Sequence, residues 1–211
     1  MSGAGHGFLG AVLAGGRNTR YGAHKALETV GGQRIARRAA DALARAGCEP
    51  VVLIANDVRA YAALGLATRP DARPGLGPLG GIHAALAWAR DEARPGAVVV
   101  AGDMPFAHAD LLRTLAMRAA EPRCDAAVPE SGSKRGVEPL CAAYSVACLT
   151  AVEDALAGGG GRIVGFYADV RVDRMPRGEV AAFGDERVLF LNVNTPAQRA
   201  RAERWLAEAG R

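Results

Sequence analysis

The chain has 211 residues, half of them hydrophobic but only 5% aromatic, and its 26 basic and 22 acidic residues give a formal charge of +4. This length suits one compact domain with its own core, which we expect to span residues 1–211. Apolar runs such as Ala97–Ala101 are far shorter than the roughly 20 residues of a membrane-spanning helix, so no such helix is predicted.

The basic residues, of which only two are lysine, are spread along predicted helices and are not interleaved with aromatic residues. This pattern is typical of solvated helix faces, so we expect no nucleic-acid partner, although the positive charge suits a small anionic substrate. Residues 1–8 hold no lysine or arginine and are too short for a signal peptide, which favours the cytoplasm. The sequence leaves the oligomeric state open, and a monomer is the simplest expectation.

Short apolar runs alternate with segments of helical periodicity along the first 120 residues. They predict strands at Phe8–Ala14, Val51–Ala55 and Ala97–Ala101 and helices at Arg34–Ala46, Val58–Leu64, Leu79–Glu92 and Leu111–Ala120. This alternation predicts an α/β fold of three layers, with a mostly parallel central sheet and helices on both faces. Further along we expect strands at Ala126–Pro129, Leu140–Tyr144 and Val188–Leu191, an exposed turn at Ser131–Gly136, and helices at Ala147–Leu156 and Ala197–Ala209.

The cysteines and histidines show no metal-ligand spacing. The four cysteines form no Cys-x-x-Cys pair and lie in apolar segments, which predicts reduced and mostly buried thiols: Cys48, Cys124, Cys141 and Cys148. The four histidines are scattered along the chain, so a zinc site is not expected.

The loop after the first predicted strand, Gly15–His24, combines glycines with two arginines and leads to Lys25. Glycines allow backbone N–H groups to approach an anion closely, while arginine and lysine supply positive charge around it. The loop does not fit the Walker A pattern, because Lys25 does not directly follow its last glycine. Phosphate binding is favoured, and a plain surface turn is the alternative.

A second glycine-rich stretch, Gly75–Gly80, has the G-x-G-x-x-G spacing of a dinucleotide site, but no predicted strand precedes it. We therefore do not expect a nicotinamide-dinucleotide site, although these glycines and the following helix N-terminus can approach a ligand. Asp71, at the start of this loop, is either a turn residue or a ligand-facing carboxylate.

Asp103 follows the continuous apolar run that ends at Ala101, so its carboxylate is expected at the carboxyl edge of the sheet. Parallel sheets bind ligands beyond this edge, and a carboxylate there suits Mg²⁺ held together with substrate phosphates. The alternative is a helix cap before Met104 and Pro105.

Four segments in order resemble the MobA-like nucleotidyltransferases, the family of the molybdenum cofactor guanylyltransferases, over nearly the whole chain. The family begins with a strand and L-A-G-G-x-x-x-R-M-G-x-D-K, which is similar to Leu13–Lys25 here. G-P-L-x-G, D-x-P and N-x-N-T-P follow, and they resemble Gly77–Gly81, Asp103–Pro105 and Asn192–Pro196. Tyr21 and His24 depart from the family's methionine and aspartate, and Ile54 stands where some members have an asparagine.

The resemblance implies transfer of GMP from GTP to molybdopterin carrying molybdenum, with Mg²⁺ as cofactor and pyrophosphate as the second product. It implies contact with proteins that handle the molybdenum cofactor. Matching positions imply catalytic roles for Lys25, Arg20 and Asp103, metal binding by Asp103, and nucleotide binding by Leu13, Ala14, Gly15, Gly16, Lys25, Asp71 and Asp103. The positions that the resemblance assigns to acceptor binding are Arg162, Asn192 and Asn194.

Three alternatives stay open at this point. The first is a related nucleotidyltransferase with another base or acceptor, such as a molybdopterin cytidylyltransferase or a sugar-phosphate nucleotidyltransferase. The second is a nucleotide-binding regulatory module without turnover, and the presence of both Asp103 and Lys25 argues against it. The third is an arginine-rich interaction protein, which would bind polyanions with a steep dependence on salt and without nucleotide preference.

Overall fold

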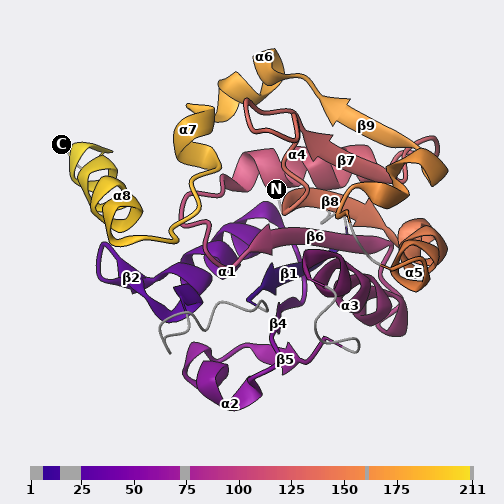
Figure 1. The fold of residues 1–211 in the computed structure, drawn as a ribbon, viewed down its shortest axis with the longest axis horizontal. Coiled ribbons are helices and arrows are strands. Elements are labelled where there is room, and N and C mark those ends of the chain that lie inside the picture. Colours follow the sequence, from indigo (N-terminus) through magenta and orange to yellow (C-terminus); the bar gives the residue numbers. More distant parts are fainter. Residues whose placement is uncertain (1–6, 15–24, 72–76, 160–161, 210–211) are drawn as a thin grey trace, which may run out of the picture.

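A seven-stranded sheet forms the centre of the protein, in a computed structural model that describes residues 7–14, 25–71, 77–159 and 162–209 (Figure 1). The strand order is β5-β4-β1-β6-β8-β7-β9, and every strand except β8 runs in the same direction. The predicted mostly parallel sheet is therefore confirmed. Its strands are β1 (Leu9–Leu13), β4 (Val51–Ile54), β5 (Ala67–Arg69), β6 (Gly96–Ala101), β7 (Ala126–Pro129), β8 (Cys141–Ser145) and β9 (Val172–Met175).

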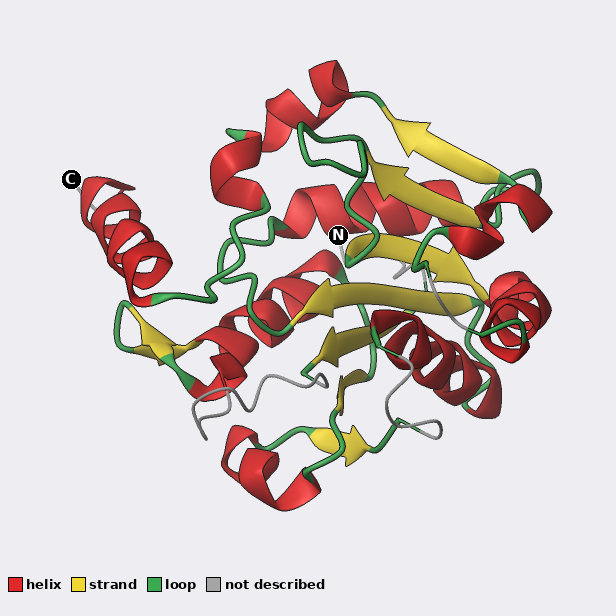
Figure 2. Ribbon diagram, in the orientation of Figure 1, coloured by secondary structure: helices red, strands yellow, loops and turns green. Residues whose placement is uncertain are grey.

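Helices cover both faces of the sheet, which confirms the three predicted layers (Figure 2). Successive residues of a strand point to opposite faces, and β1 divides its side chains accordingly. Val12 packs in the core beneath α1 (Ile35–Ala46) and α4 (Ala109–Ala119). Leu9 packs in the core beneath α3 (Pro78–Asp91) and α5 (Leu149–Ala157).

A third, smaller core holds the C-terminal helix α8 (Pro196–Ala209), which stands at the margin of the molecule beside a hairpin (Figure 1). The hairpin is formed by β2 (Thr29–Val30) and β3 (Gln33–Arg34). The other short elements are α2 (Val58–Tyr61), α6 (Arg177–Val180), α7 (Glu186–Leu189) and the 3₁₀ turns η1 (Lys25–Leu27), η2 (Ala62–Leu64), η3 (Val146–Cys148), η4 (Gly165–Asp169) and η5 (Ala181–Phe183).

The predicted strand at Val188–Leu191 is wrong, because this segment contains the end of α7. Its four apolar residues are compatible with either a buried strand or a buried helical turn, and periodicity cannot separate the two over so short a run. Asp185 decides the outcome: its side chain accepts a hydrogen bond from the backbone N–H of Arg187 and caps α7.

The described cysteines are all free thiols, as predicted, with Cys124 only partly buried and the other three buried. Burial, with a smaller contribution from the nearby Glu138 carboxylate, raises the pKa of the Cys141 thiol to about 12. Within the described ranges, no helix is long and apolar enough to cross a bilayer.

Candidate active site

The sheet changes its winding direction between β1 and β6. From β1 the chain moves outward to β4 and β5, then returns to β6 on the other side of β1. The carboxyl ends of β1 and β6 lie side by side, with Leu13 opposite Ala101. Such a switch point is where open α/β sheets bind ligands, because the loops after the two strands diverge.

Gly102 allows the two loops to come close together. Its N–H donates to the Leu13 carbonyl at 2.9 Å. A Cβ at this position would lie 3.2 Å from the same oxygen and 3.3 Å from the Ala14 Cα. A larger residue would therefore push the loop of β1 away from that of β6.

Asp103 lies half-buried in the turn that ends β6, as predicted. The helix-cap alternative for Asp103 is wrong, because α4 begins later and its N-cap is His108. The Asp103 carbonyl accepts a hydrogen bond from the Val193 N–H at 2.9 Å, although the two residues lie far apart in the sequence.

This backbone hydrogen bond brings the Asn192–Pro196 segment to the edge of the sheet beside Asp103. The Asn192 side chain donates to the Phe190 carbonyl at 3.1 Å, and the Asn194 N–H donates to Gln198 Oε1 at 2.8 Å. The segment is therefore fixed at one end by the β6 turn and at the other by the first turn of α8.

Leu13 and Ala14 end the first strand and lead into the glycine-rich loop. The Ala14 N–H donates to the Ile54 carbonyl at 2.9 Å, and the Ala14 carbonyl accepts a hydrogen bond from the Tyr61 hydroxyl at 3.1 Å. Tyr61 is almost completely buried, and burial raises the pKa of its hydroxyl. It was missed in the sequence because a lone tyrosine on a short helix gives no motif.

Asp71 is buried against the first turn of α3. A Cβ built on Gly80 would collide with the Asp71 carboxylate, so these two residues are in direct proximity. The Asp71 N–H donates to Asn56 Oδ1 at 2.9 Å, which fixes the backbone just after β5. A carboxylate at a helix N-terminus is stabilised by the helix dipole, which accounts for the position of Asp71 beside α3. Its role as a ligand-facing carboxylate stays a prediction.

The remaining predicted site residues are Gly15, Gly16, Arg20, Lys25 and Arg162. Gly15, Gly16 and Arg20 lie outside the described residues, and Lys25 begins η1. Arg162 is exposed and lies in the segment between α5 and η4.

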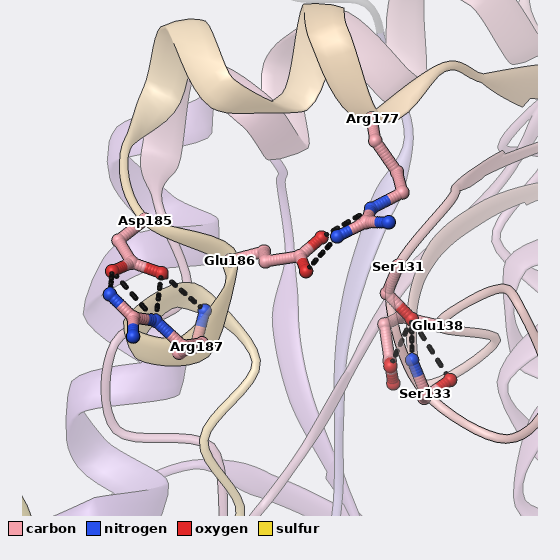
Figure 3. Close-up of polar contacts among 7 residues, drawn as sticks. All are labelled: Ser131, Ser133, Glu138, Arg177, Asp185, Glu186 and Arg187. Carbon is pink, nitrogen blue, oxygen red and sulfur yellow. Dashed lines mark hydrogen bonds and ion pairs between the residues drawn. The ribbon is translucent and has the colours of Figure 1, made fainter.

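A polar cluster at the carboxyl end of β7 was also missed in the sequence (Figure 3). The predicted turn at Ser131–Gly136 is present, but Ser131 itself is buried, and its hydroxyl lies 2.7 Å from Glu138 Oε1. Arg177 donates to Glu186 through Nε at 2.9 Å and Nη2 at 2.5 Å, and these bonds hold the pKa of the Glu186 carboxyl below its ordinary value.

The donor set suits one kind of metal. Across the described ranges, no group of three or more histidine, cysteine or acidic side chains could form a metal cage. Mg²⁺ does not require one, since it is commonly held by one or two carboxylates together with substrate phosphates and water. Asp103 at the switch point fits this coordination, whereas a structural zinc site would need more protein ligands.

An open α/β sheet with a switch-point edge is typical of nucleotide-binding proteins. A profile of the MobA-like NTP transferase domain matches residues 10–171, and the chain belongs to this family. This confirms the resemblance seen in the sequence.

Relatives match over almost their whole length. The probable molybdenum cofactor guanylyltransferase of Pelotomaculum thermopropionicum is 40% identical over 96% of this chain and 94% of its own length. The molybdenum cofactor guanylyltransferase of Desulfosudis oleivorans is 33% identical, with 96% of each chain covered. Among solved structures, molybdopterin-guanine dinucleotide biosynthesis protein A from Archaeoglobus fulgidus superposes with a TM-score of 0.78 at 27% identity, covering 95% of this chain and 100% of that one.

Proposed function

We propose that this enzyme transfers GMP from GTP to the terminal phosphate of molybdopterin carrying molybdenum, forming the guanine dinucleotide cofactor and pyrophosphate. The names of its relatives support this substrate pair. The observation that carries the proposal is the Val193–Asp103 hydrogen bond, because it joins a late segment of the chain to the switch point. A transfer reaction needs one site that holds both substrates. The hydrogen bond supports such a site, because it brings the segment assigned to the acceptor beside the loop assigned to the nucleotide.

In the proposed reaction, an oxygen of the acceptor phosphate attacks the α-phosphorus of GTP in line. A new P–O bond forms as the bond to the β-phosphate bridging oxygen breaks, and pyrophosphate leaves with the electron pair. No general base is required, because the attacking phosphate is ionised at neutral pH. The protein therefore contributes positioning and neutralisation of charge.

The chain supplies these contributions from both halves of the edge. Backbone N–H groups of the first loop would hold the triphosphate, together with the charges of Arg20 and Lys25. Asp103 would hold Mg²⁺, which when bound neutralises charge on the phosphates and orients them. The remaining assignments are Leu13, Ala14, Gly15, Gly16 and Asp71 to the nucleotide and Arg162, Asn192 and Asn194 to the acceptor.

A direct test compares GTP, CTP, ATP and UTP as donors to molybdenum-loaded molybdopterin in the presence of Mg²⁺. We expect pyrophosphate and the guanine dinucleotide in equal amounts with GTP, and loss of both when the metal is chelated. A preference for CTP would replace the guanylyl assignment with a cytidylyl one. Tight nucleotide binding without product would contradict transfer itself.

A further inference from the structure

Glu138 lies in the segment that leads into β8, the strand next to β6 at the switch point. The Ala101 N–H donates to the Leu140 carbonyl at 2.8 Å, so the chain entering β8 passes beside the end of β6. Just before this point, the Glu138 N–H donates to the Pro129 carbonyl at the end of β7 at 3.0 Å. The residue is thus held at the carboxyl edge of the sheet, on the side of β6 away from β1 and β4.

The Glu138 carboxylate is oriented by its neighbours (Figure 3). The buried Ser131 hydroxyl donates to Oε1 at 2.7 Å and accepts a hydrogen bond from the Ser133 N–H at 3.2 Å. Glu186 lies against Gly132 in the same loop and is held by Arg177. Among the described residues no hydrogen bond reaches Oε2, and Oε1 accepts only the one from Ser131, so both oxygens of this half-buried carboxylate can still accept from a ligand.

We propose that Glu138 binds the pterin ring of the acceptor through its 2-amino and N3–H groups. This inference rests on the proposed function and names a residue that determines acceptor specificity. The two ring donors are adjacent and point the same way, so one carboxylate can accept from both. Ser131 acts as a positioning residue, because its hydroxyl fixes the rotation of the carboxylate.

The charges along the carboxyl edge of the sheet indicate how the acceptor would be oriented. The acceptor's phosphate must reach the α-phosphorus beside Asp103, so its ring must extend away from the triphosphate. Glu138 would repel a phosphate but attract a row of N–H donors, which places the ring over β8. Guanine carries a similar donor edge, but the nucleotide's assigned contacts lie on the opposite side of β6, where Asp71 packs against α3.

The test measures recognition of the ring separately from turnover. 6-Hydroxymethylpterin phosphate would be compared with the matching lumazine, which carries an oxygen in place of the 2-amino group. Binding would be measured by calorimetry in wild type, Glu138→Gln and Ser131→Ala, with Glu121→Gln as an exposed carboxylate control. Turnover with molybdopterin and GTP would be measured on the same preparations.

We expect wild type and Glu121→Gln to prefer the pterin by about tenfold or more, the range of charge-assisted hydrogen bonds. Glu138→Gln should lose this preference, since an amide places one N–H against the ring donors, and Ser131→Ala should reduce it. The acceptor KM should rise in Glu138→Gln with the GTP KM unchanged. An unchanged pterin preference in Glu138→Gln, no preference in wild type, or a rise in the GTP KM alone would overturn the inference. If wild type binds pterins selectively but transfers no GMP, the proposed function fails while the role of Glu138 stands.

Discussion

Asp103 has separate functions in its main chain and its side chain. The carbonyl holds Val193, whereas the carboxylate is the proposed metal ligand. Asp103→Asn keeps the backbone hydrogen bond and the side-chain shape but removes the charge. We therefore expect a normal melting temperature and a loss of pyrophosphate release of about 100-fold or more.

Melting curves and initial rates on one preparation check this prediction. Asp91→Asn, at the far end of α3, serves as a control that removes a carboxylate away from the edge. Near-normal turnover by a folded Asp103→Asn protein would rule out the metal assignment.

Gly80 offers a test of the nucleotide half that does not touch a charged group. Gly80→Ala adds a Cβ where the Asp71 carboxylate lies, so this carboxylate must move. We expect the KM for GTP to rise about tenfold, which corresponds to a loss of 1.4 kcal/mol, while the acceptor KM stays unchanged. Gly178→Ala, where an added Cβ meets nothing within 4 Å, should leave both constants unaltered.

At the scale of elements, α8 anchors the segment that carries Asn192 and Asn194. Trp205 of α8 packs edge-on against Phe106, with ring centroids 6.1 Å apart, and Phe106 belongs to the loop after β6. Trp205→Ala should remove the contact between α8 and the loop after β6 and lower the free energy of unfolding by about 1 kcal/mol or more. Because the segment proposed to bind the acceptor is then less well held, the acceptor KM should rise several-fold with little change for GTP.

Steady-state kinetics with each substrate varied in turn would measure this effect. Arg204→Ala changes an exposed residue of the same helix and should behave like wild type. An equal loss of affinity for both substrates would show that α8 supports the whole edge.

An ion pair links β7 and β9 at the amino ends of these two strands, away from the switch point. Arg171, just before β9, donates to Asp125, just before β7, through Nε at 2.8 Å and Nη2 at 2.6 Å. These hydrogen bonds hold the pKa of the Asp125 carboxyl below its ordinary value of 3.8. The stabilisation is therefore complete above that value and is lost as the pH falls through the lower pKa of the folded state.

Urea unfolding of Asp125→Asn should show a lower midpoint than wild type at pH 7, and the difference should shrink below pH 3.8. Asp91→Asn removes an exposed ion pair with Arg69 and should change the midpoint much less. A difference that stays constant down to pH 3 would contradict the assignment.

The elements that the sequence did not predict share a physical cause. β5 and β9 are edge strands of three and four residues, and each pairs with only one neighbouring strand. Their extended conformation therefore depends on this pairing and leaves no long apolar run in the sequence. The β2–β3 hairpin did carry a signal, since Gly31 and Gly32 stand between Val30 and Gln33 in positive-φ conformations. The interior strands β1, β4 and β6 were predictable because burial on both faces requires continuous apolar runs.

At the scale of the whole molecule, the sequence predicted the loops of the site better than their contacts. Asp103 could be placed at the sheet edge because only Gly102 separates it from a buried strand. Its pairing with Val193 could not be predicted, since nothing in either segment specifies the other across the intervening chain. The same holds for Tyr61 and Ala14, whose hydrogen bond depends on how α2 returns to the sheet.

The Val193–Asp103 contact also has a consequence for the order in which activity is acquired during synthesis. Val193 follows Asp103 by 90 residues, which a ribosome takes roughly 5–20 s to add. A nascent chain that has just emerged to Asp103 contains the strands of the nucleotide half but lacks the segment that completes the edge. With the proposed division of the site, such a chain lacks the acceptor contacts of Asn192 and Asn194, so we expect transfer only once synthesis has passed Val193.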